Sequence, residues 1–284
     1  MQISDLASMR RLLGATVAGV VLAFGVPAHG STLGGLVERA VEQQISKHFS
    51  QQAAPPVSLP PAGSFAGCRQ LFPKGAVLDV AKVERQWGAT ALCSNHFAAL
   101  HSGLSKTPLL VVERLSRAQM AQALDEARTD EFYADPRLPT SARAELEDYR
   151  GSGLDRGHLA PAGDQPNPES MAQSFALSNM VPQDPTNNRK AWAKIESDVR
   201  KFVRRAQGDV YVFSGPLFRG EQRTIGRNRV WVPSHLFKLV YDEASGRSWA
   251  YVLANTAEAR VGAPVDYPEF VRQTGWQLLG RSPG

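Results

Sequence analysis

The sequence has little cysteine, since Cys68 and Cys93 are the only two in 284 residues. Neither belongs to a Cys-x-x-Cys pair, which argues against a zinc site and against thiol redox chemistry. An even number of cysteines favours a disulfide in a chain that is exported, and closing this loop would stabilise the fold by roughly 3 kcal/mol. Two unpaired buried thiols are the alternative.

Long hydrophobic runs are also missing. The apolar run near the N-terminus, residues 12–26, has 15 residues, whereas a membrane-spanning helix needs roughly 20. It follows Arg10 and Arg11 and precedes small residues at 28–31, the spacing that a signal peptidase recognises. We therefore predict a signal peptide over residues 1–30, a periplasmic or secreted protein, and no stable membrane insertion after its removal. An uncleaved anchor is the alternative.

No internal repeat is visible, which argues against a solenoid. The chain has 43% hydrophobic and 21% charged residues, which is ordinary for a folded protein and excludes disorder throughout. Removing residues 1–30 takes away two arginines and one aspartate, so the formal charge changes from +5 to +4. A basic chain attracts polyanions, but the same surplus occurs in proteins that bind no nucleic acid.

Residues 31–63 are predicted to be separate from the folded domain. Apolar residues recur at helical spacing over residues 33–49, which predicts an amphipathic helix. Its apolar stripe could cap the main domain, pair with a second copy in a homodimer, or touch a membrane surface. Four prolines within residues 53–63 predict an extended linker. The main domain is therefore expected over residues 64–284.

The remaining pattern predicts a mixture of antiparallel strands and helices, the α+β class. Helices are predicted at residues 116–127 and after Asn188, where an apolar stripe continues to Val203. Apolar segments edged by Gly or Pro predict strands at residues 109–112, 175–181, 210–213, 230–232, 236–241 and 249–253.

The most informative feature is the tetrapeptide Asp155-Arg-Gly-His158 within residues 149–164. Two further blocks follow it in order, residues 174–183 and residues 188–196. This combination resembles the DNA/RNA non-specific endonucleases of the ββα-metal superfamily, with the resemblance covering roughly Cys68 to the C-terminus. It implies a ββα-metal nuclease fold, with a central antiparallel sheet flanked by helices.

The resemblance also implies how the site is built. Asn188 aligns with the single asparagine that holds one divalent cation in the family, and Mg²⁺ suits so few protein ligands, with Mn²⁺ also possible. Glu196 matches a residue that reaches the cation through water. Asn179 matches a supporting asparagine and is expected to bond a substrate or metal-shell oxygen. Arg156 and, less tightly, Arg128 match arginines that contact the scissile phosphate.

Histidine suits proton transfer from water near neutral pH, so we expect His158 to be the general base. Asp155 is expected to orient the motif backbone or Arg156. Each of these residues could instead have a purely structural role: a helix cap for Asn188, a solvated surface position for Glu196 or Arg128, and a turn for Asn179.

These features predict an exported, metal-dependent endonuclease for DNA and RNA. The sequence has no zinc finger, helix-turn-helix or basic-region motif, so it offers no means of reading base edges, and cleavage should tolerate many sequences. One alternative is a catalytically inactive nucleic-acid-binding protein of the cell envelope. Another is an exported phosphodiesterase that acts on small esters.

Overall fold

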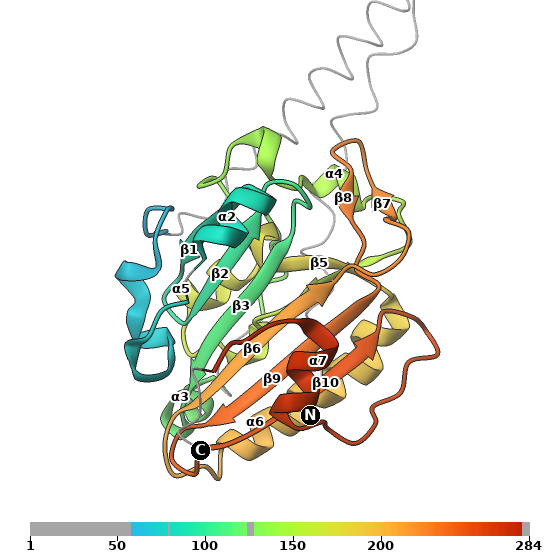
Figure 1. Cartoon of the computed structure of the whole chain (residues 1–284). Helices are drawn as coiled ribbons and strands as arrows, with labels where there is room; N and C mark the ends of the chain where they lie inside the picture. The colour runs from blue at the N-terminus through green and yellow to red at the C-terminus, as the bar shows by residue number, and fades with distance from the viewer. Residues whose placement is uncertain (1–57, 79, 124–127, 280–284) are drawn as a thin grey trace, which may run out of the picture. The chain divides into compact units, whose positions relative to one another are not determined.

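A six-stranded antiparallel sheet forms the centre of the fold, in the order β1-β2-β3-β6-β9-β10 (Figure 1). The computed structural model describes residues 58–78, 80–123 and 128–279. The strands of this sheet are β1 (Ala89–Cys93), β2 (Phe97–Ser102), β3 (Pro108–Leu115), β6 (Val210–Leu217), β9 (His235–Asp242) and β10 (Arg247–Ala254).

Both faces of this sheet are covered, which explains why its strands are almost continuously apolar. On β3, Val111 and Leu115 point into one hydrophobic cluster while Leu110 and Val112 point into another, as the twofold alternation of a strand requires. Helix α6 (Ala193–Val203) packs on the first face and α7 (Tyr267–Thr274) on the second, as Figure 1 shows.

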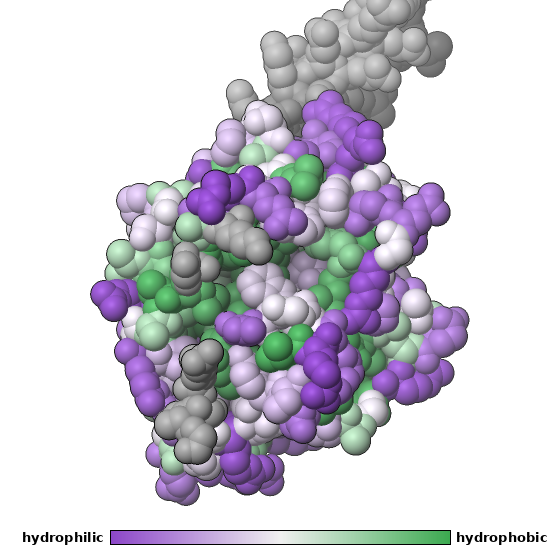
Figure 2. Space-filling view, viewed as in Figure 1, coloured by the Kyte–Doolittle hydropathy of each residue, from purple (hydrophilic) through white to green (hydrophobic). Residues whose placement is uncertain are grey.

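In space-filling form, the side of the sheet that carries α7 shows hydrophobic patches among hydrophilic side chains, which dominate the outline (Figure 2). The other α-helices are short: α2 (Ala81–Trp87), α3 (Arg117–Gln122), α4 (Leu146–Tyr149) and α5 (Pro168–Ser174). Within the described residues, the 3-10 segments are the kinked η1 (Phe65–Leu71) and the single turns η2 (Pro73–Gly75), η3 (Thr140–Ala142), η4 (Ala162–Asp164) and η5 (Leu177–Asn179).

A separate two-stranded sheet pairs β4 (Asp155–His158) with β5 (Met180–Gln183). A π-helical turn, η6 (Asn187–Trp192), follows β5 and leads directly into α6. Together β4, β5 and α6 form a ββα unit, and Leu159 just after β4, Val181 of β5 and Ile195 of α6 belong to the core cluster on the α6 side of the large sheet. A second pair of short strands, β7 (Thr224–Ile225) and β8 (Val230–Trp231), completes the fold. The predicted α+β class is confirmed.

Cys68 and Cys93 form the predicted disulfide, which ties η1 to the end of β1. Within the described residues, no helix has the length and apolar character needed to span a bilayer. The predicted signal peptide and amphipathic helix lie outside the described residues, as do residues 124–127 of the helix predicted at 116–127.

Most predicted strands are confirmed, but the strand predicted at residues 175–181 is wrong over its first five residues. Phe175 ends α5, residues 177–179 form η5, and β5 begins only at Met180. Phe175 and Leu177 are buried among other side chains, so their apolar character reflects packing and not a strand period. Asn179 therefore lies in a tight turn.

Candidate active site

The ββα unit brings the three sequence blocks together. In the β4–β5 pair, Asp155 lies opposite Gln183 and His158 lies opposite Met180. Gly157 packs so closely on Gln183 that a Cβ at this position would overlap that side chain. The glycine of the tetrapeptide is therefore required by the close approach of the two strands.

His158 is at the end of β4 and only 8% exposed. Its ring packs against two aromatic rings, with centroids 5.7 Å from Phe132 and 5.1 Å from Phe175. Within the described residues its Nε2 is buried and has no hydrogen-bond partner. Burial, assisted by the charges of Arg128 and Arg156, lowers the pKa of His158 to about 3. The imidazole is therefore neutral at pH 7, and its ring lines the cavity described below.

Asn179 fixes the backbone just after His158. It is fully buried, and its side chain accepts from Ala160 N and donates to Ala160 O, both at 2.9 Å. Its own carbonyl accepts from Leu159 N. The expectation that Asn179 bonds a substrate or metal-shell oxygen is wrong, because its carboxamide oxygen and nitrogen both bond to the backbone of Ala160. Asn179 supports the site from behind.

Asn188 is oriented by Asp155. Its Nδ2 donates to Asp155 Oδ2 over 2.9 Å, and no hydrogen bond within the described residues uses its Oδ1. Asp155 also accepts two hydrogen bonds from Arg189. The expectation that Asp155 orients Arg156 is therefore wrong, since its partners are on η6. The amide oxygen of Asn188 is left available to an electropositive ligand.

The π turn places Asn188 and Glu196 on the same side of the helix. A π turn rotates each residue by less than the roughly 100° of an α-helix. The offset of about 80° expected for eight α-helical residues is therefore reduced, and both side chains line one cavity. Asn188 is not a helix cap, because it lies inside the turn and Asp184 Oδ1 accepts from Asn187 N where the segment begins.

Glu196 is half-buried at the start of α6, and burial raises the pKa of its carboxyl group to about 7, against the opposing charge of Lys238. One turn further along α6, Arg200 donates to the buried Asp164 at 2.9 Å. The Glu196 carboxylate and the Asn188 amide provide oxygen ligands, which Mg²⁺ prefers. Within the described residues no three His, Cys, Asp or Glu side chains cluster. The two oxygen donors fit a hard cation that keeps most of its water ligands.

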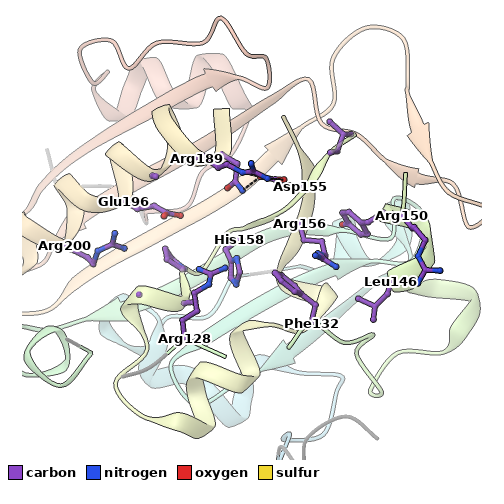
Figure 3. Close-up of a pocket in the computed structure, with 17 residues that line it drawn as sticks. Arg128, Phe132, Leu146, Arg150, Asp155, Arg156, His158, Arg189, Glu196 and Arg200 are labelled. Atoms are coloured by element: carbon purple, nitrogen blue, oxygen red, sulfur yellow. Dashed lines mark hydrogen bonds and ion pairs between the residues drawn. The ribbon is translucent and has the colours of Figure 1, made fainter. Parts of the chain in front are cut away.

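Arginines surround His158 in a cavity of about 820 Å³. Figure 3 shows His158 between Arg128 and Arg156, with Glu196 on the helix nearby. The Arg156 guanidinium carbon lies 4.1 Å from the Phe132 ring centroid, and Arg128 lies 5.2 Å from that of Phe175. Phe132, Arg150 and Arg189 also line the cavity, although the sequence did not predict this.

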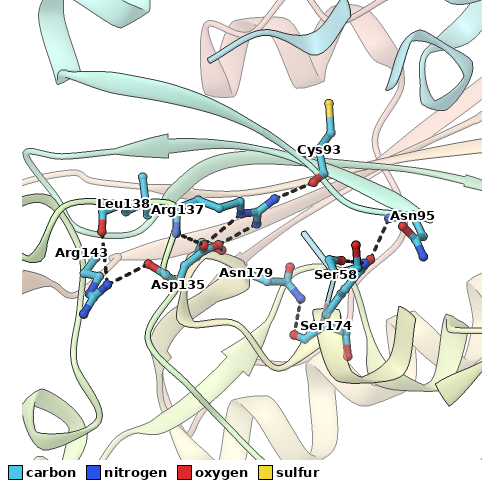
Figure 4. A network of polar contacts seen from close by, with 11 residues as sticks. Ser58, Cys93, Asn95, Asp135, Arg137, Leu138, Arg143, Ser174 and Asn179 are labelled. Carbon is cyan, nitrogen blue, oxygen red and sulfur yellow. Dashed lines mark hydrogen bonds and ion pairs between the residues drawn. The ribbon is translucent and has the colours of Figure 1, made fainter. Parts of the chain in front are cut away.

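A buried polar network braces the turn that contains Asn179 (Figure 4). Asp135 is fully buried, pairs with Arg137 at 2.6 Å, and accepts from Ser178 Oγ at 2.5 Å. Arg137 also donates to the carbonyl of Cys93, at 2.5 Å. Burial acts to raise the pKa of Asp135, but the hydrogen bonds from Arg137 and Ser178 lower it overall. The network connects the disulfide to the turn whose Asn179 holds the backbone after His158.

Comparison with known proteins agrees with this arrangement. Residues 80–278 match the family model described as DNA/RNA non-specific endonuclease. The chain is 36% identical over 187 residues to human mitochondrial nuclease EXOG, covering 60% of this chain and 50% of that protein. It is 39% identical over 172 residues to human mitochondrial endonuclease G, covering 56% and 55%. The chain thus spans about half the length of these curated relatives.

A solved structure shows a similar fold. A chain from the crystal structure of the EndoG/EndoGI complex superposes with a TM-score of 0.59 and 28% sequence identity. The match covers 67% of this chain and 84% of that chain. The ββα unit and the antiparallel sheet therefore lie within a known architecture.

Proposed function

The chain belongs to the DNA/RNA non-specific endonuclease family, and from this premise we propose that it is an exported, metal-dependent endonuclease that hydrolyses phosphodiester bonds of DNA and RNA. One observation carries the proposal: the unpartnered Nε2 of His158 and the amide oxygen of Asn188 belong to side chains that line one arginine-rich cavity. A base, a cation ligand and phosphate-binding groups are thereby brought together.

In the proposed mechanism, His158 accepts a proton from the attacking water on its imidazole ring. Its imidazole is already neutral at pH 7, as a base must be. The guanidinium groups of Arg128 and Arg156 bind the non-bridging phosphate oxygens. Because the phosphate is an anion, its arrival offsets the two charges that lower the pKa of His158, so the base becomes stronger when substrate is bound.

We propose that Asn188 holds the divalent cation directly and that Glu196 reaches it through water. When bound, the cation stabilises negative charge on the phosphate and on the departing sugar oxygen. Mg²⁺ is the proposed ion, with Mn²⁺ as a substitute, because both donors are oxygens. The neutral amide leaves the positive charge of the cation uncancelled.

The proposed location is the periplasm or the outside of the cell. Two features support it: the signal-peptide pattern of residues 1–30, which lies outside the described residues, and the disulfide between Cys68 and Cys93. Disulfides persist chiefly in oxidising compartments. Detection of the processed protein in periplasmic and culture fractions would check the proposal, and retention of the full chain in the cytoplasm would contradict it.

The activity test uses supercoiled plasmid and total RNA with Mg²⁺, Mn²⁺ or a chelator. Wild type should cleave both polymers in metal and neither in chelator, while His158→Ala should lose about 10²- to 10⁴-fold in rate. Asn188→Ala should lose cleavage at limiting metal. Activity that survives chelation, or full activity of His158→Ala, would defeat the mechanism.

The same assay separates the two alternatives. Salt-sensitive binding without cleavage in any metal would indicate an inactive binding protein of the envelope. Hydrolysis of a small aryl phosphodiester far faster than of polymer would indicate a phosphodiesterase for small esters.

A further inference from the structure

A buried lysine contacts the backbone beside the proposed base. Lys238 is on β9, is only 1% exposed, and lies on the face of the large sheet that α6 covers. Its Nζ donates to Leu159 O at 3.1 Å and to Ser214 Oγ at 2.5 Å. Burying an ammonium group costs free energy. The hydrogen bond from Lys238 to the carbonyl of Leu159, the residue after His158, therefore needs an explanation.

The neighbouring carbonyl is held in the same way. Trp192, the last residue of η6, is 1% exposed and donates from Nε1 to His158 O at 3.1 Å. Lys238 Nζ lies 4.9 Å from the Trp192 ring, within the range of a cation–π contact. Two side chains that touch each other therefore bind two successive carbonyls, those of His158 and Leu159.

These bonds complete the fixation of this segment. Asn179 already bonds Leu159 N and both backbone polar groups of Ala160. Lys238 and Trp192 add the carbonyls of Leu159 and His158. Since a misplacement of about 1 Å can cost about 10²-fold in rate, a base without side-chain hydrogen bonds depends on such a fixed backbone.

Lys238 is also a positive charge among buried acids. Glu113, 1% exposed on β3, has no hydrogen-bond partner on either carboxyl oxygen within the described residues. Burial, with the nearby charge of Asp164, raises its pKa, while Lys238 opposes that shift. A variant that removes Lys238 therefore changes both a hydrogen bond and the local charge, and an experiment must separate the two.

Resting on the function proposed above, we propose that Lys238 and Trp192 are positioning residues that fix the backbone carbonyls of Leu159 and His158 and thereby aim the His158 ring at the scissile phosphate. They touch the backbone and not the cavity, since neither lines it. Their loss should therefore affect the rate of the chemical step and not the affinity for substrate.

The first test compares kcat and KM on a short labelled duplex in Mg²⁺. Lys238→Met and Trp192→Phe each remove one donor and keep an apolar side chain of related shape. We expect kcat to fall about 10- to 100-fold in each, with KM essentially unchanged. Wild-type kcat in both variants would overturn the inference. Absence of cleavage by wild type would instead contradict the proposed function.

The second test separates charge from hydrogen bonding. Glu113→Gln combined with Lys238→Met removes the buried acid together with the buried ammonium group, so it should fold even where Lys238→Met alone does not. We expect its kcat to remain low, because the Leu159 carbonyl still has no side-chain donor. Recovery of wild-type kcat in the double variant would show that the single variant failed through charge, and would overturn the inference.

A readout other than activity completes the design. Hydrogen exchange should be accelerated at the amides of Leu159 and Ala160 in Lys238→Met and in the double variant, with the strands of the large sheet unchanged. Leu239→Ala is the matched control, because Leu239 is buried on the opposite face of the same strand. It should lower stability without lowering kcat of the folded enzyme. An equal loss of kcat in this control would indicate a merely structural role.

Discussion

Asn188 Nδ2 donates to Asp155 Oδ2 over 2.9 Å, which joins the first residue of the tetrapeptide to the proposed cation ligand. A carboxamide can rotate to present either its oxygen or its nitrogen, and only the oxygen binds a cation. By accepting from the nitrogen, Asp155 selects the orientation that frees the oxygen. Asp155 is therefore the partner that orients the ligand.

Asp155→Ala should weaken Mg²⁺ binding about 10- to 100-fold, the usual cost of losing such a partner. Calorimetric titration of Mg²⁺ without substrate measures this directly. Arg189→Ala is the control, because it removes the exposed partner of Asp155 and keeps the bond to Asn188. The role assigned to Asp155 is wrong if Mg²⁺ binds both variants and wild type equally.

Glu196→Gln should raise the Mg²⁺ concentration for half-maximal cleavage by about 10-fold or more, because a neutral amide holds a metal-bound water less firmly. Asp198→Asn is a matched control: it neutralises another acid on α6, one whose pairing with Lys194 and Lys201 lies outside the cavity. Equal Mg²⁺ dependence of Glu196→Gln and wild type would place Glu196 outside the metal shell.

Much of the site could be predicted because its chemistry is concentrated in three short blocks. His158 and Arg156 of the first block and Asn188 and Glu196 of the third line the cavity, and so does Arg128, which precedes the blocks in the sequence. The helix after Asn188 was predictable because Ile195, Val199 and Val203 repeat at helical spacing and are buried together. A sequence segment whose apolar residues repeat with one clear period predicts its secondary structure well.

Three features could not be predicted, each for a physical reason. The π turn depends on backbone bonds that no residue type specifies, although it decides where Asn188 points. The role of Asn179 depends on a turn, and the apolar residues on either side of it led to the prediction of a strand there. Phe132, which lines the cavity, and the buried Phe175 meet His158 only through tertiary packing.

His101→Gln should become more stable relative to wild type as the pH falls. His101 is 1% exposed, and burial lowers its pKa to about 4. Below pH 6.5 the unfolded chain binds a proton that the folded chain refuses, so wild-type stability is lost as pH falls toward 4. The stability difference should change by about 1.4 kcal/mol per pH unit between roughly pH 6 and 4.

Denaturant unfolding of both proteins at several pH values measures this difference, and other titrating groups cancel in the comparison. Glutamine can still donate to Ala142 O, the partner of His101 Nε2. A difference that does not vary with pH would mean that His101 becomes protonated within the folded protein.

Removing the disulfide should lower the free energy of unfolding by about 3 kcal/mol, because Cys68 and Cys93 are separated by 25 residues. Cys68→Ser with Cys93→Ser tests this by denaturant unfolding, with reduced wild type as a second measurement.

Loss of the disulfide should change the activity only slightly. The link to the active site is the Cys93 carbonyl, which accepts from Arg137, and Arg137 pairs with Asp135 beneath the Asn179 turn. At 25 °C, where the variant remains folded, kcat should stay within about threefold of wild type because that carbonyl is retained. Loss of activity without loss of stability would show that the disulfide acts on the site itself and not through the fold.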